Sequence, residues 1–358
     1  MVNLISGKKL FIWACVLAGT LAAVACIIAR NCDPAVLRRD LLAADLRYLA
    51  AACACMAGFV CCESRNIGRV LNDLEKGGVG FLQSLKYGAA GFFFSSITPS
   101  STGGQPMQLY YMHRDGIPLS HGTLSLALLG MGYQIGSMTF ALLGLVDHAQ
   151  LLQQQAPVTK TVLTIGISTS GALLALLIGV SFSRRLADGA EKLLLAFAEK
   201  MRRPQWRESI ARQFLEYRRC SVLIRRRPGL LARNIATSLV QMALTFSVPY
   251  LVYRSLGCSG SSWLEIMSLQ AVLSTGLAIV PIPGTAGAAE GGFQLIFRTV
   301  FPAAQLLPGM ILSRSINIYA SILMTGAVLA VLLLRDTVRR RTPQHPRIIQ
   351  QATEEAES

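Results

Sequence analysis

Two short segments of the chain combine hydroxyl residues, glycines and prolines inside otherwise apolar runs. In residues 94–112, Thr98-Pro99 precedes three more hydroxyl residues and a Gly-Gly pair; in residues 281–292, two prolines precede several glycines and Glu290. Such residues break a helix, and the N–H groups at the start of the next helix, together with its dipole, favour an anion. Glycine also lets a bound group approach the backbone closely. This chemistry suits a lipid phosphate.

The candidate binding residues lie in these two breaks, with one arginine added from the last apolar run. They are Thr98, Ser100, Ser101, Thr102, Gly103, Gly104, Gln105, Pro283, Gly284, Thr285, Glu290 and Arg314. For the first break the alternative is a capped helix end whose polar groups satisfy one another.

Glu290 and Arg314 are charged residues within apolar surroundings. Glu290 is the only acidic residue between Glu265 and Asp336, and an acid at membrane depth is a candidate functional residue. Two interpretations stay open. The two side chains form a buried structural ion pair, or Arg314 holds a lipid phosphate while Glu290 binds a cationic head group or carries a coupling proton.

Other chemistries find little support in the sequence. His113 and His121 flank a polar turn, where an interfacial position is favoured over a proton relay. The nine cysteines follow no zinc-binding spacing, so we expect them to pack as small apolar residues. No Ser-His-Asp order, Walker loop or dinucleotide motif is present. We therefore expect no metal, no cofactor and no enzyme activity.

The composition is that of a membrane protein. Of 358 residues, 52% are hydrophobic and only 15% charged, with a mean hydropathy of +0.47, and apolar runs of about 20 residues recur. The formal charge is +15. Much of it lies in residues 184–229 and 335–347, as the positive-inside rule expects of cytoplasmic segments. We therefore expect no nucleic-acid partner.

The predicted fold class is an all-α polytopic membrane protein. Six apolar runs are predicted to span the membrane: 10–29, 41–62, 120–146, 161–182, 230–254 (kinked near Pro249) and 309–334. The basic segments all fall on one side of the membrane only if neither 81–112 nor 263–301 crosses it. Each of these two segments must then leave the membrane on the side from which it entered. We therefore expect two re-entrant helical hairpins of opposite orientation at 81–112 and 263–301.

This organisation makes residues 1–335 a single transmembrane domain with an inverted repeat. Half one is 10–146 and half two is 161–334. The basic segment 184–229 begins with an amphipathic helix, either on the inner leaflet or as a solvated linker. Residues 336–358 are expected to form a disordered cytoplasmic tail. We expect both termini in the cytoplasm and the protein in the cell (plasma or inner) membrane.

The two breaks together resemble the lysylphosphatidylglycerol synthase transmembrane-region family. The resemblance rests on Thr98 to Pro106 followed by Tyr110-Tyr111 and Gly116-Ile117, on Pro281 to Gly292, and on Arg314 followed by Tyr319. It covers about residues 8–335. It implies a flippase-like membrane unit in which Thr98, Pro99, Gly103, Gly104, Gln105, Pro283, Gly284, Glu290 and Arg314 are important.

In bifunctional members of that family, this membrane unit moves aminoacylated phosphatidylglycerol from the inner to the outer leaflet, and a separate synthetase domain makes the lipid. About 24 residues follow the last apolar run here, so we expect no synthetase. The cargo is then an aminoacylated phosphatidylglycerol-like lipid or another anionic or polyprenyl lipid, moved with or without a coupling proton or ion.

Two other function classes remain. One is an ion-coupled transporter of a small solute. The other is a membrane-embedded enzyme that modifies a lipid, for which only one well-placed acid is visible in the sequence. The sequence leaves the oligomeric state open, a homodimer included.

Overall fold

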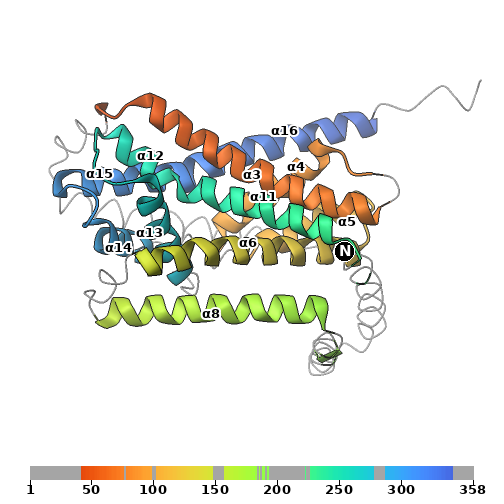
Figure 1. Ribbon diagram of the computed structural model, residues 1–358. Helices are drawn as coiled ribbons and strands as arrows, with labels where there is room; N and C mark the ends of the chain where they lie inside the picture. The colour runs from red at the N-terminus through yellow and green to blue at the C-terminus, as the bar shows by residue number, and fades with distance from the viewer. Residues whose placement is uncertain are drawn as a thin grey trace, which may run out of the picture.

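The computed structural model describes residues 42–75, 78–98, 102–147, 157–183, 226–277 and 287–341, with five isolated residues between 184 and 225. All regular elements within these ranges are helical (Figure 1). The predicted span 10–29, most of the amphipathic segment and the last 17 residues lie outside the described residues. So do the candidate binding residues Ser100, Ser101, Pro283, Gly284 and Thr285.

Four helical segments are long and apolar enough to cross a membrane. They are α3 (Leu46–Leu74), α6 (Leu119–Asp147, of which Leu119–Val146 forms the apolar segment), α11 with α12 (Pro228–Phe246, Val248–Ser255), and α15 with η3 and α16 (Ala303–Arg314, Ser315–Ala320, Ser321–Arg341). A fifth helix, α8 (Pro157–Phe182), contains the apolar stretch Leu163–Leu176. The multi-pass helical membrane class is thus confirmed.

Helix α3 is longer than the predicted span 41–62. Asp45 caps its start by accepting a hydrogen bond from the Arg47 N–H at 2.8 Å, and the helix continues to Leu74. Beyond residue 62 its polar side chains bond to neighbouring helices, while Ile67 and Leu71 remain fully buried. The prediction ended too early because a charged residue at position 63 closes the apolar run, although the helical spacing of apolar residues continues.

The predicted kink near Pro249 is confirmed. The helix is interrupted at Ser247, and Pro249 lies in the first turn of α12. Proline has no N–H to donate to the preceding turn and its ring crowds the carbonyl four residues earlier, so the helix bends before it.

Each half contains a helix that stops and restarts. Helix α4 (Phe81–Ile97) is followed by α5 (Gly104–Arg114), and α13 (Trp263–Gly276) is followed by α14 (Ala288–Phe297). In Figure 1, α4 and α5 lie toward the end of the bundle where α16 finishes, whereas α13 and α14 lie toward the opposite end. The breaks therefore occur where the sequence predicts them.

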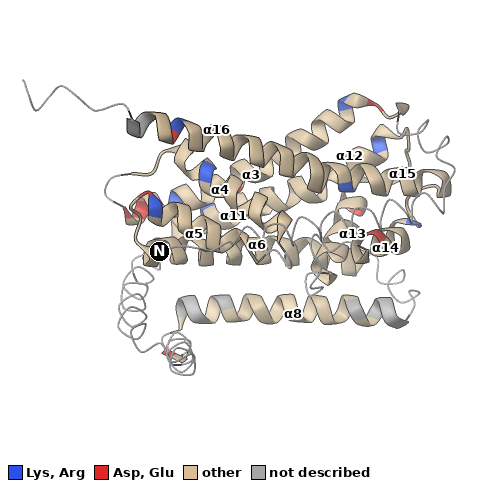
Figure 2. Ribbon diagram, turned by 180° about the vertical axis from the view of Figure 1, so that it is seen from behind, with Lys and Arg blue, Asp and Glu red and all other residues tan. Residues whose placement is uncertain are grey.

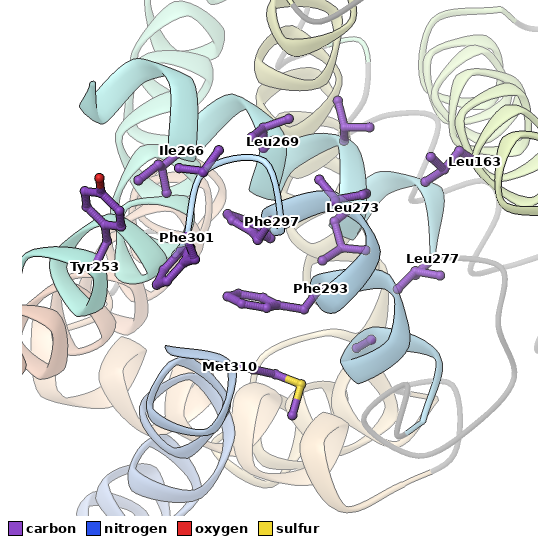
Figure 3. Close-up of a cluster of buried hydrophobic side chains, with 14 of the residues drawn as sticks. Leu163, Tyr253, Ile266, Leu269, Leu273, Leu277, Phe293, Phe297, Phe301 and Met310 are labelled. Atoms are coloured by element: carbon purple, nitrogen blue, oxygen red, sulfur yellow. The ribbon is translucent and has the colours of Figure 1, made fainter. Parts of the chain in front are cut away.

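Aromatic residues fix the second broken helix in place. Phe293 and Phe297 stack with ring centroids 4.2 Å apart, and Phe301 meets Tyr253 of α12 edge to face at 5.1 Å (Figure 3). Met310 of α15 belongs to the same buried cluster. Such aromatic contacts contribute about 0.5–1.5 kcal/mol each beyond their burial, so packing holds α14 in place.

Candidate functional site

The first break is closed by the hydroxyl of Thr98. Its Oγ1 donates to the carbonyl oxygen of Phe94 at 2.6 Å and accepts the Gly103 N–H at 2.9 Å. Thr98 is thus the residue at which α4 ends, and its side chain also binds the backbone of Gly103, the residue before α5. One backbone donor at this break is therefore satisfied within the protein, as the alternative interpretation of this segment expects.

Glycine is required at position 104 by the close approach of α4 and α5. A Cβ there would lie 2.0 Å from Ser95 Oγ and 2.6 Å from the Gly91 carbonyl oxygen. The N-terminal end of α5 therefore lies directly against α4. Thr102 and Gln105 are exposed beside it, and the first N–H groups of a helix have no partner within the helix. This arrangement can present donors to an anion.

The second break brings Glu290 and Arg314 together. Glu290, in the first turn of α14, accepts the Gly287 N–H at 2.5 Å and Arg314 Nε at 2.9 Å. The two side chains are 13% and 18% exposed, so the ion pair is largely desolvated. Gly287 has φ of +82°, a conformation for which glycine is favoured. The ion pair is thus formed, and its structural and transport roles are both compatible with the geometry.

An irregular helical turn follows Arg314. Residues 315–320 form the π-helix η3 between α15 and α16. Within the described residues, the side-chain oxygens Ser313 Oγ and Asn317 Oδ1 are buried without a hydrogen-bond partner. Single π-turns are frequent at functional sites. Close to Arg314 in the sequence, therefore, two buried oxygens can still accept a hydrogen bond.

The candidate residues fall into two separate groups. Thr98, Gly103 and Gly104 form one group on α4 and α5, and Glu290 and Arg314 form the other on α14 and α15.

A network of charged and polar side chains that the sequence analysis missed joins α4, α5 and α16. Lys86 Nζ lies 2.7 Å from Asp115 Oδ2 and also pairs with Asp336 of α16. The Tyr87 hydroxyl donates to Asp115 Oδ2 at 2.7 Å. Lys86 is only 4% exposed. The one signal in the sequence is this lysine within the apolar run of residues 81–97.

A second missed network joins α3 to α11. Arg69 donates to Asn234 Oδ1 at 2.9 Å and to Thr237 Oγ1 at 3.1 Å, and Asn66 Nδ2 donates to Ser238 Oγ at 3.0 Å. These bonds hold polar residues inside the bundle. In Figure 2, most of the coloured charged residues lie toward the two ends of the bundle.

A third missed contact joins α3 to α5. Gln108 Nε2 donates to Glu63 Oε1 at 2.8 Å. Gln108 is buried and belongs to the second turn of α5. The two positions are 45 apart in the sequence, a separation from which no regular spacing predicts the contact.

Comparison with protein families matches residues 11–343 to the lysylphosphatidylglycerol synthase TM region. This match covers nearly the whole chain. No curated protein matches the sequence. Within the described residues, no group of three or more His, Cys, Asp or Glu side chains could hold a metal ion.

Proposed function

This chain belongs to the lysylphosphatidylglycerol synthase TM region family, and from that premise we propose that it moves a phospholipid between the two leaflets of a membrane. The helical, multi-pass character of the protein fits a lipid-related membrane function. The cargo we propose is an aminoacylated phosphatidylglycerol-like lipid or another anionic or polyprenyl lipid. The membrane is the cell membrane, with both termini in the cytoplasm.

The observation that carries the proposal is the Glu290–Arg314 ion pair at the start of the half-helix α14. A helix start together with an arginine can hold a phosphate, and a glutamate beside them can hold an amino group. The start of α5 supplies the second phosphate position. In this proposal α4–α5 and α13–α14 are re-entrant hairpins of opposite orientation among six full spans, and the head group crosses between them while its tails stay in the bilayer.

The test is lipid translocation in proteoliposomes that carry zwitterionic, anionic or aminoacylated lipids. Glu290→Gln removes the charge but keeps an oxygen that can accept the Gly287 N–H. Because a hydrogen bond to a charged group contributes about 1.5–3 kcal/mol, we expect translocation to fall about 10- to 100-fold.

Glu265→Gln is the matched control. Glu265 also lies in the first turn of its helix and accepts the N–H of its capping residue, Ser262, at 3.2 Å. It has no arginine partner among the described residues. Wild-type vesicles no faster than empty ones would overturn the proposal. Full activity in Glu290→Gln would make the ion pair structural and leave α5 as the site.

Measurements on the same vesicles also test the two other function classes. Mass spectrometry of the lipids after incubation detects a chemical change, which would favour a lipid-modifying enzyme. Uptake of a small solute without lipid movement would favour an ion-coupled solute transporter. We propose transport without catalysis.

A further inference from the structure

Glu63 is a second acid inside the bundle, and the proposed transport site does not use it. It lies on α3, partly buried, and accepts the hydrogen bond from Gln108 of α5. Within the part of the chain that the structure describes, no Lys, Arg or His pairs with it. Glu290, in contrast, is paired with Arg314. A carboxylate in the interior of a membrane protein without a cation is costly and marks a functional position.

The surroundings place Glu63 at the depth of the helix midpoints. Tyr133, which interacts electrostatically with Glu63, is the middle residue of the 29-residue helix α6. On the α4 side, a Cβ at Gly91 would lie 3.0 Å from Glu63 Oε1 and 2.1 Å from Gln108 Nε2. The carboxyl group therefore packs against the backbone of α4, which leaves no room on that side for a lipid amino group. A proton needs no such room.

The titratable groups around α3 have other partners or lie along other faces. Tyr133 of α6 interacts electrostatically with Glu63. The others are Lys86 with Asp115 and Asp336, His121 with Glu75, Arg69 with Asn66, Asn234 and Thr237, Arg227 with Asp73, Arg254 beside Tyr48, and Arg65 and Arg233 in the neighbourhood of Arg69. None of these cations compensates the charge of Glu63.

Glu63 lies close to the start of α5. Its partner Gln108 is the fifth residue of α5, about 6 Å along the helix from its first residue at 1.5 Å per residue. A negative charge at this position opposes the binding of an anion at the helix start, and a proton on Glu63 removes that opposition. A protonated carboxyl group can also donate to the amide oxygen of Gln108, so the contact between α3 and α5 is retained in both states.

We propose that Glu63 is the proton-binding residue of this protein, and that its protonation favours an anionic lipid phosphate at the start of α5. One proton converts the carboxylate to the acid, and the same proton leaves when the lipid is released. The proton and the anionic lipid then move in the same direction. The link to lipid transport rests on the proposed function, whereas the proton site itself does not.

The first experiment measures the proton site without transport. Infrared difference spectra of the purified full-length protein between acidic and neutral pH report the protonated carboxyl band. We expect Glu63→Gln to remove a band that remains in Glu75→Gln, which changes the glutamate at the C-terminal end of the same helix. A second variant, Gln108→Leu, keeps Glu63 and removes its donor, so the band should shift in frequency. An unchanged band in both Glu63→Gln and Gln108→Leu would overturn the proposal.

The second experiment measures anionic-lipid translocation in proteoliposomes with an imposed pH gradient. Acid on the side from which the lipid leaves should accelerate the wild type about ten-fold, as expected for one proton bound per lipid over one pH unit. Glu63→Gln mimics the protonated form and should transport at a rate independent of pH. A wild type that moves no lipid but keeps the Glu63 band would overturn the proposed function alone. A pH-dependent Glu63→Gln would overturn the coupling role.

Discussion

Glu290 and Arg314 carry charges that the interior of a membrane protein tolerates when they are paired. Their contact at 2.9 Å is largely desolvated. When one member of a buried pair is removed, the other remains as an uncompensated charge, whereas removal of both is much less costly. The energetics of the pair can therefore be separated from its role in transport.

We expect Glu290→Gln and Arg314→Gln each to lower the free energy of unfolding by about 3–5 kcal/mol. The double variant should lose clearly less than the sum of the two. Thermal unfolding of the four proteins in one detergent gives the coupling energy. The control is Arg227→Gln: Arg227 pairs with Asp73 at 3.2 Å but is 65% exposed, so its loss should be about 0–1 kcal/mol. Additive losses for Glu290 and Arg314 would show that the pair does not stabilise the fold.

At the scale of the elements, the sequence predicted both helix breaks because proline and glycine act locally. The restart at Gly104 and the interruption before Pro249 follow from such local chemistry. The true end of α3 and the contact between Glu63 and Gln108 depend on residues far apart in the chain. The Lys86 network likewise joins residues up to 250 positions apart. Polar residues inside a bundle are explained by partners that sequence spacing does not reveal.

The contact between α8 and α13 gives a prediction at this scale. A Cβ at Gly166 would lie 1.9 Å from the Gly276 carbonyl oxygen, which is backbone and cannot turn aside. Gly166→Ala should therefore separate the two helices and lower the melting temperature by several degrees, since overpacking costs about 1–3 kcal/mol.

Gly171→Ala on the same helix is the control for that change. Its Cβ would meet only Met138 Cε at 3.5 Å, an ordinary contact, so its stability should be unchanged or slightly higher because alanine favours the helix. Equal melting temperatures for the two variants would mean that α8 is free to shift along α13.

At the scale of the whole molecule, the orientation of the two ends of the bundle is open to direct measurement. His113, in the last turn of α5, and Ser259, before α13, are exposed. Helices α5 and α13 lie toward opposite ends of the bundle (Figure 1). In cells, we expect Ser259→Cys to react with a membrane-impermeant maleimide from outside. His113→Cys should react only after permeabilisation.

These variants need a background without Cys258. Burial raises the pKa of the Cys258 thiol above its usual range, so at neutral pH less of it is the reactive thiolate than at an exposed cysteine, and its labelling increases as the pH rises. Cys258→Ser removes this slow signal. If both engineered cysteines react from the same side, the proposed inverted arrangement is wrong.

The position of α8 also has a consequence for the order in which the helices pack during synthesis. Helix α8 packs against α6, which precedes it, and against α13, which follows it. The Ser170 hydroxyl donates to the carbonyl oxygen of Thr275, and Gly166 lies directly against the backbone of Gly276. At about 5–20 residues per second, the ribosome needs roughly 5–20 s to add the chain between the end of α8 and the end of α13. During that time the face of α8 that packs against α13 has no partner, so the second half of the protein completes its packing only after α13 has been made.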